Sequence, residues 1–104
     1  MIVDELYAVI AGRKGADPET SYTAKLFAKG RGKIAQKLGE EAIETVVAAV
    51  SQGKPEVVAE SADLLYHLLV LWADCGVDPA EVWAELARRQ GVSGIDEKNS
   101  RPKK

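Results

Sequence analysis

The sequence predicts an all-α fold, a helical bundle with two long antiparallel central helices that homodimerisation completes. Three observations support this class. No segment alternates apolar and polar side chains as a half-buried strand does. Apolar side chains recur instead three and four positions apart along most of the 104 residues. Glycine and proline fall between these periodic segments, where helices are expected to end and begin.

The two helices nearest the N-terminus are expected to be short. Apolar residues at helical spacing predict a first helix over residues 2–13. Pro18 interrupts the loop that follows, and Ser21 is suited to cap a second helix, Tyr22–Lys29. Tyr22 itself is expected to be an ordinary core aromatic, with stacking on a ligand ring as the alternative.

A joint at Gly30-Arg31-Gly32 is expected to separate the second helix from a long third helix, which runs from Lys33 to about Ser51. Gly39 lies inside this helix at a cost of about 1 kcal/mol relative to alanine. Close approach of another backbone is one reason to accept that cost. The expected inner face is a mainly apolar stripe of Ile34, Leu38, Ala42, Thr45, Val46 and Ala49.

The fourth predicted helix is equally long. Gly53 ends the third helix, and Pro55 suits the first turn of the fourth, which runs to about Asp74. Gly76 would cap it in the left-handed conformation. Because the connection between the third and fourth helices is short, the two are expected to pack antiparallel.

The fifth predicted helix has a strong start signal. Asp78 is a good N-cap, Pro79 suits the first turn, and Glu81 completes a capping box. Its expected inner face comprises Val82, Leu86 and Ala87, and Gly91 would end it. Residues 1–91 are therefore expected to form a single domain and residues 92–104 a polar tail.

The two central helices are apolar over much of their circumference. The runs Val46–Val50 and Leu64–Leu71 leave few polar positions. A single chain of this size cannot cover so much apolar helix surface. We therefore expect a symmetric homodimer whose centre is a helical bundle.

Acidic residues are concentrated on the two central helices. Glu40, Glu41 and Glu44 lie within five residues of the third helix, where like charges repel unless a cation neutralises them. Glu60 and Asp63 form a second pair on the fourth helix. A charged pair on a helix is usually a solvated face, but both pairs lie in apolar stretches, where uncompensated carboxylates are unfavourable. Antiparallel packing would bring the pairs together as an oxygen cage for a hard divalent metal.

Composition excludes several classes of function. The net charge of −2 offers no basic surface for nucleic acid. The longest apolar run is too short to span a bilayer, and the first residues have no basic region of a signal peptide. The single cysteine cannot form an intrachain disulfide, which suits a reducing compartment. We expect a cytoplasmic protein without nucleic-acid or membrane partners.

The acidic motif, Glu40-Glu41-x-x-Glu44 followed by Glu60-x-x-Asp63, resembles the metal-binding signature of the all-α nucleoside triphosphate pyrophosphohydrolases. Its flanks are more specific and are similar to the phosphoribosyl-ATP pyrophosphatase family of histidine biosynthesis. The similarity covers nearly the whole chain. The matching segments are Ser21–Leu26, Gly32–Glu41, Glu60–His67 and Arg88–Gly94, followed by Glu97-Lys98.

The resemblance implies a magnesium-dependent homodimer that hydrolyses phosphoribosyl-ATP, between the α- and β-phosphates, to phosphoribosyl-AMP and pyrophosphate. Glu41, Glu44, Glu60 and Asp63 are then expected to bind Mg²⁺. More than one ion per site is expected to fit, because four or five carboxylates exceed what one ion needs. Glu40 is either a further ligand or the base that orients the attacking water.

Basic residues near this motif are candidates for binding the substrate phosphates as point charges. Lys25, Lys33 and Lys37 are such candidates, with an ion pair to Glu41 as the alternative for Lys37. Arg31 could bind a phosphate at the glycine-flanked joint or be an ordinary solvated loop arginine.

His67, one turn beyond Asp63, is expected to be either a core histidine bonded to a carboxylate or a support for a metal ligand. Trp72 and Trp83 are expected in the core or the dimer contact.

Two other functions fit the same residues. One is a house-cleaning hydrolase of ordinary or damaged nucleoside triphosphates, which would prefer dATP or dUTP to phosphoribosyl-ATP. The other is a helical dimerisation module without activity. In that case Glu44→Gln or Asp63→Asn would preserve or raise thermal stability, and magnesium would change nothing.

Overall fold

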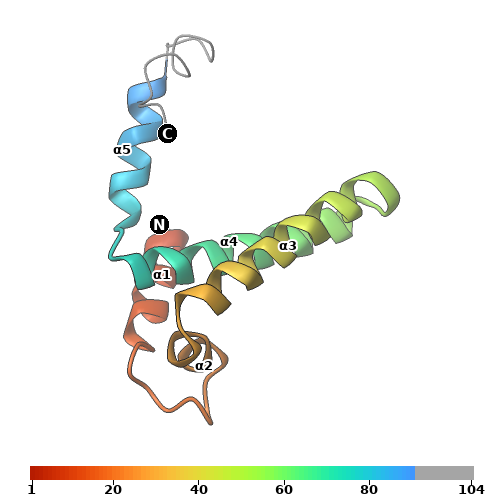
Figure 1. Ribbon diagram of the computed structural model, residues 1–104. Coiled ribbons are helices and arrows are strands. Elements are labelled where there is room, and N and C mark those ends of the chain that lie inside the picture. The colour runs from red at the N-terminus through yellow and green to blue at the C-terminus, as the bar shows by residue number, and fades with distance from the viewer. Residues whose placement is uncertain (91–104) are drawn as a thin grey trace.

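The computed structural model describes residues 1–90, which form five helices and no strand, so the predicted all-α class is confirmed (Figure 1). The helices are α1 (Ile2–Gly12), α2 (Tyr22–Lys29), α3 (Arg31–Ser51), α4 (Lys54–Cys75) and α5 (Pro79–Arg89). None of these helices has both the length and the apolar character that a bilayer crossing requires. The predicted end of the fifth helix at Gly91 and the predicted tail, residues 92–104, lie outside the described residues.

Local capping signals explain most helix boundaries. The hydroxyl of Ser21 accepts a hydrogen bond from the backbone N–H of Ala24 at 3.1 Å, as the N-cap prediction requires. At the start of α5, the backbone N–H of Asp78 donates to Glu81 Oε2 at 2.8 Å and completes the capping box. Gly76 ends α4 with a φ of 74°, the left-handed region that favours glycine. These predicted boundaries are confirmed because each depends on residues within one turn.

The start of α3 differs from the prediction. The helix begins at Arg31, and Gly32 lies inside it rather than in the joint. Gly30 alone makes the joint, with a φ of 96°, and its carbonyl oxygen accepts from the backbone N–H of Ile34 at 3.2 Å. One residue in the left-handed region suffices to redirect the chain, so the helix starts two residues earlier than Lys33.

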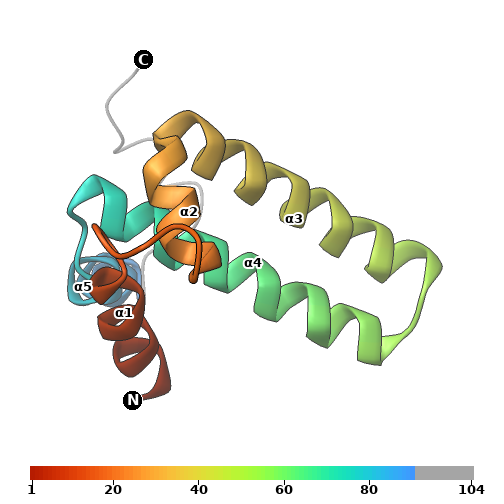
Figure 2. The same cartoon turned by 90° about the horizontal axis from the view of Figure 1, so that it is seen from below.

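The two central helices α3 and α4 form an antiparallel hairpin, as predicted (Figure 2). Helices α1 and α2 pack against only one end of the hairpin (Figure 1). The buried core lies at that end. It comprises Ile10, Leu26, Ile34, Leu69, Val70 and Ala73.

The inner face of α3 is rotated from the predicted one. Ile34 and Ala48 are fully buried, whereas Val46 and Ala49, both predicted to face inward, are exposed. Small errors in helical phase accumulate over a 21-residue helix. Toward the C-terminal end of α3, the predicted stripe therefore no longer faces α4. A side chain added at Gly39 would meet no atom within 4 Å, so the predicted close approach of a backbone is wrong within this chain.

Helix α5 points away from the hairpin, and within residues 1–90 it packs against the other helices near its N-terminal end (Figure 1). The Trp72 and Trp83 rings meet edge to face, with centroids 5.9 Å apart, and the Tyr7 hydroxyl donates to the Val77 carbonyl oxygen at 2.8 Å. Leu86 is 53% exposed, so the predicted inner face of α5 is largely uncovered in a single chain. Ala87, in the same predicted face, is also exposed.

Candidate metal centre

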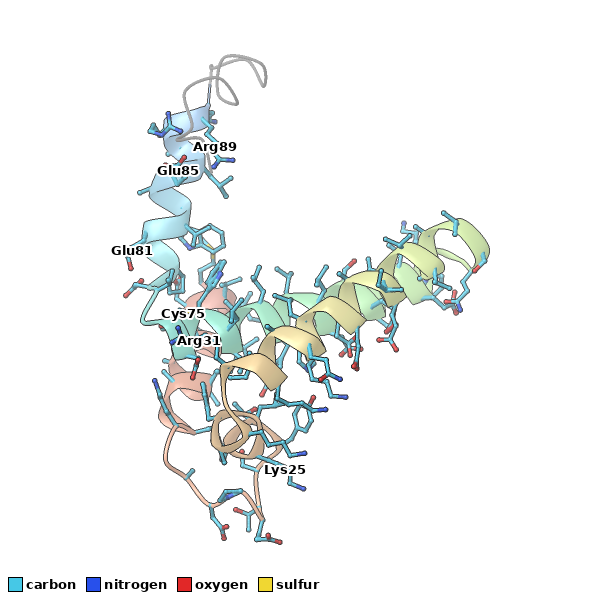
Figure 3. The ribbon with its side chains drawn as sticks, in the orientation of Figure 1. Lys25, Arg31, Cys75, Glu81, Glu85 and Arg89 are labelled. Atoms are coloured by element: carbon cyan, nitrogen blue, oxygen red, sulfur yellow. The ribbon has the colours of Figure 1, made fainter. Side chains whose placement is uncertain are left out.

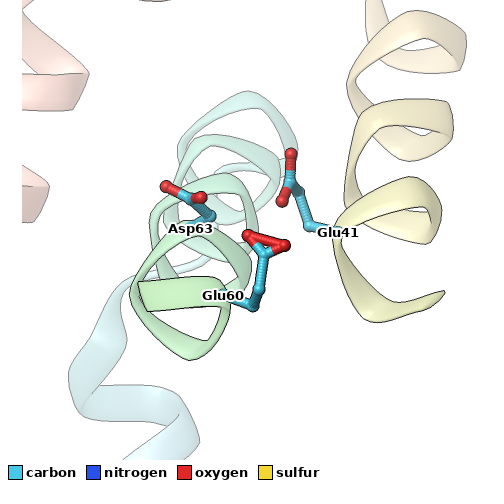
Figure 4. Close-up of side chains that lie close together, drawn as sticks. All are labelled: Glu41, Glu60 and Asp63. Carbon is cyan, nitrogen blue, oxygen red and sulfur yellow. The ribbon is translucent and has the colours of Figure 1, made fainter. Parts of the chain in front are cut away.

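Three carboxylates converge between the central helices (Figure 4). Glu41 reaches from α3, and Glu60 and Asp63 reach from α4. One oxygen from each lies within 4.8 Å of the other two. This spacing would let one small cation contact all three side chains.

Helical register brings these side chains together. Glu60 and Asp63 are three residues apart and so lie on one face of α4. Thr45, one turn after Glu41, contacts both helices. Its hydroxyl lies 2.8 Å from the carbonyl oxygen of Glu41 and 3.3 Å from that of Glu60. This shared contact sets α3 against α4 at the level of the carboxylates.

The electrostatic state of the cluster fits a bound cation. Glu41 Oε2 is buried and has no hydrogen-bond partner among the described residues, which is unfavourable for a carboxylate oxygen. Burial raises the pKa of Glu41, and the nearby Glu44 and Asp63 carboxylates raise it further. Burial and the same two neighbours also raise the pKa of Glu60. A set of carboxylate oxygens alone matches a hard divalent ion such as Mg²⁺.

Glu44, the fourth predicted ligand, lies beside the cluster rather than within it. It is exposed, yet its charge is close enough to raise the pKa of both Glu41 and Glu60. Glu44 also lines an open depression of about 650 Å³, together with Gly39, Glu40 and Ile43. The structure thus brings three of the four predicted ligands together and leaves the fourth at the edge.

Glu40 and Lys37 bind each other on the exposed side of α3. Glu40 accepts hydrogen bonds from Gln36 Nε2 at 2.8 Å and from Lys37 Nζ at 3.4 Å, and these bonds lower its pKa. The alternative predicted for Lys37, an ion pair with Glu41, is therefore wrong. Glu41 turns inward between the helices, so Lys37 reaches the outward neighbour instead.

The other predicted phosphate-binding residues do not lie together. Figure 3 shows Lys25 on α2, away from Arg31 near the end of α4. Lys25 is exposed on α2 and Lys33 half-buried on α3, and no ion pair is recorded for either within residues 1–90. Arg31 donates from Nε to Asp74 Oδ2 at 2.7 Å and from Nη2 to the Asp74 carbonyl oxygen at 3.0 Å. Arg31 is therefore the first residue of α3 rather than a loop residue. Its side chain is solvated, as one alternative predicted, being 62% exposed, and it pairs with the end of α4.

Of the two aromatic side chains beside the cluster, His67 is buried as predicted but bonds a different group, and Tyr22 lies in a different environment from the predicted one. His67 is only 6% exposed, and its Nδ1 lies 2.7 Å from the backbone carbonyl oxygen of Asp63, not from a carboxylate. Tyr22 is 52% exposed rather than a core residue, and its hydroxyl lies 2.9 Å from His67 Nε2. The two residues are 45 positions apart in the sequence, so no helical spacing could reveal this contact.

Fold and site together define an all-α protein with a carboxylate cluster suited to a divalent cation. A family model described as phosphoribosyl-ATP pyrophosphohydrolase matches residues 3–90. The chain belongs to this family, and the family and enzyme class expected from the sequence are confirmed.

Similar proteins bear the corresponding name. A phosphoribosyl-ATP pyrophosphatase of Paramagnetospirillum magneticum is 79% identical over 99% of this chain and 94% of its own length. Proteins of the same name from Rhodospirillum rubrum and Azospirillum brasilense are 70% and 65% identical. The match to the Rhodospirillum rubrum protein covers 98% of this chain and 87% of that protein. The match to the Azospirillum brasilense protein covers 96% of this chain and 90% of that protein.

Proposed function

We propose that this chain hydrolyses phosphoribosyl-ATP to phosphoribosyl-AMP and pyrophosphate in the cytoplasm, as an early step of histidine biosynthesis, and that it requires Mg²⁺. Family membership supports the substrate. The observation that most supports the chemistry is the convergence of Glu41, Glu60 and Asp63 around an unpaired buried carboxylate oxygen.

In this proposal, Glu41, Glu60 and Asp63 hold the cation and Glu44 approaches it from the edge of the cluster. Bound Mg²⁺ would neutralise the triphosphate and activate a water molecule. With Glu44 included, the four carboxylates exceed the needs of one ion, so the site has room for a second.

Glu40 has the properties of a group that orients water. Its lowered pKa keeps it ionised at neutral pH, where it accepts hydrogen bonds but is a weak base. Gln36 and Lys37 hold its carboxylate along the exposed side of α3. We therefore assign Glu40 to positioning the attacking water rather than to direct metal binding.

The substrate phosphates require positively charged side chains, and we propose four of them from the helices around the cluster. Lys25 and Lys33 have ammonium groups that no recorded ion pair within residues 1–90 occupies. Lys37 is held beside the cluster by Glu40. Arg31 uses Nε and Nη2 for Asp74, which leaves Nη1 to reach a phosphate while the ion pair orients the guanidinium.

We also propose that the chain functions as a homodimer. Its radius of gyration is 15.8 Å, whereas a compact domain of this length has about 13 Å. Side chains three and four apart on α3 form an exposed apolar stripe: Ile43, Val46, Val47 and Val50, exposed by 44% to 79%. Such a continuous apolar stripe favours burial against a second copy. Gly39, one turn before Ile43, would then allow a partner backbone to approach closely.

The direct test is pyrophosphate release from phosphoribosyl-ATP, measured with Mg²⁺ and with a chelator. We expect release only with Mg²⁺, and loss of release in Asp63→Asn but not in Asp4→Asn, a matched change at an exposed position of α1. No release by the parent protein with Mg²⁺ would contradict the proposal. Faster hydrolysis of dATP or dUTP would instead support a house-cleaning hydrolase with the same carboxylates.

A further inference from the structure

A chain of hydrogen bonds links α2 to the acidic cluster. The Tyr22 hydroxyl lies 2.9 Å from His67 Nε2, and His67 Nδ1 lies 2.7 Å from the Asp63 carbonyl oxygen. His67 is almost fully buried, while the Tyr22 ring is half exposed. This series of hydrogen bonds thus begins at the surface and ends on the backbone of a proposed metal ligand.

The chemistry of the partners assigns the direction of each bond. A carbonyl oxygen only accepts, so His67 Nδ1 must carry the hydrogen. In the neutral ring, Nε2 is then the acceptor and the Tyr22 hydroxyl donates to it. With its hydrogen committed, the Tyr22 oxygen offers only lone pairs to its surroundings. Lys37, whose positive charge acts on the Tyr22 hydroxyl, carries an ammonium group that can donate a hydrogen bond to such a lone pair.

We infer that Tyr22 and His67 are positioning residues, which set the α4 turn of Asp63 and hold α2, with Lys25, over the acidic cluster. Lys25 lies three residues after Tyr22 and therefore near it on the surface of α2. Because the cluster is the metal site of the proposed function, this inference rests on that function.

A second bond provides a matched comparison. The hydroxyls of Thr23 and Tyr66 also join α2 to α4, one residue along each helix. This bond docks the same two helices but does not reach the backbone of Asp63. Removing the hydroxyl of Tyr66 therefore tests the docking of α2 alone, whereas removing that of Tyr22 tests docking together with the link to the cluster.

The experiment compares Tyr22→Phe with Tyr66→Phe, and adds His67→Asn, whose amide can keep the bond to the Asp63 carbonyl but cannot reach Tyr22. Magnesium affinity is read from the rise in melting temperature with Mg²⁺ concentration, without substrate. Since residues that orient metal ligands affect affinity by about 10- to 100-fold, we expect Tyr22→Phe to weaken Mg²⁺ binding roughly tenfold. His67→Asn should weaken it similarly, and Tyr66→Phe should leave it within about twofold of the parent.

A spectroscopic measurement tests the bond directly and does not depend on activity. In the parent, the ¹⁵N resonances of His67 should report hydrogen on Nδ1 and none on Nε2. Tyr22→Phe should shift the Nε2 resonance, and Tyr66→Phe should not. Equal losses of Mg²⁺ affinity in Tyr22→Phe and Tyr66→Phe, or no loss in Tyr22→Phe, would overturn the inference. A parent protein that neither binds Mg²⁺ nor releases pyrophosphate would instead contradict the proposed function, whatever the histidine resonances show.

Discussion

The Thr45 hydroxyl on α3 lies 3.3 Å from the backbone carbonyl oxygen of Glu60 on α4. The same hydroxyl lies 2.8 Å from the carbonyl oxygen of Glu41, one turn earlier on its own helix. A small polar side chain therefore joins two of the three backbone positions whose side chains form the acidic cluster. This contact and the surfaces around it support five testable predictions.

Thr45→Val should weaken both the hairpin and the proposed metal site. Valine keeps the branched shape but removes the hydrogen bond, so we expect a loss of about 1 kcal/mol in the free energy of unfolding. Chemical denaturation measures this loss, and the Mg²⁺-dependent rise in melting temperature should shift to higher Mg²⁺ concentration. Ser51→Ala is the control, because its hydroxyl bonds only the Val47 carbonyl oxygen of its own helix. A shift in Ser51→Ala as large as that in Thr45→Val would contradict this role.

Without metal, the protein should become more stable as the pH falls from neutral. The pKa values of Glu41 and Glu60 are raised above the ordinary 4.5, so the folded chain binds these protons more tightly than the unfolded chain. Their contribution to stability is complete below pH 4.5 and is lost as the pH rises through the raised pKa values. Melting temperatures measured with a chelator between pH 4.5 and 7.5 should show this trend.

Glu60→Gln should flatten that pH dependence and raise the melting temperature at neutral pH in chelator, because it removes one of several crowded negative charges. The same variant should lose most of the stabilisation by Mg²⁺, since the ion binds the folded state through these oxygens. Glu5→Gln, at an exposed position on α1, should change neither quantity. A lower melting temperature for Glu60→Gln in chelator would mean that the carboxylate is already compensated by another group.

Lys37→Gln should raise KM for phosphoribosyl-ATP more than it lowers kcat, because the ammonium group is proposed to bind a phosphate in the ground state. We expect roughly a tenfold rise, as for a lost hydrogen bond to a charged group. Lys29→Gln is the matched control at the exposed end of α2. A purely structural pair between Lys37 and Glu40 would leave KM unchanged.

Val46→Asp should weaken the proposed homodimer. The change puts a charge into the exposed stripe on α3, where burial against a second copy would desolvate it. We expect the dimer dissociation constant, from sedimentation equilibrium, to rise roughly tenfold or more. Val9→Asp, at an equally exposed valine of α1, should have a smaller effect. A parent protein that sediments as a monomer would refute the stripe as an interface.

Sequence reasoning succeeded where the physical cause is local. The N-cap at Ser21, the capping box of Asp78 and Glu81, and the left-handed Gly76 each depend on atoms within about one turn. It also identified the carboxylates that converge, because Glu41 and the α4 pair lie on helices that a short connection makes antiparallel. The joint before α3 was misplaced, since the identity of Gly30 and Gly32 does not show which of the two adopts a positive φ.

Most helix boundaries and the set of acidic side chains were thus determined by the sequence alone, since each residue's near neighbours decide them. Only the tertiary structure decided that Glu41 turns inward while Glu44 stays at the edge, because the rotation of α3 depends on what packs against its whole length. The contact between Tyr22 and His67 likewise depended on the docking of α2, which brings together side chains 45 residues apart.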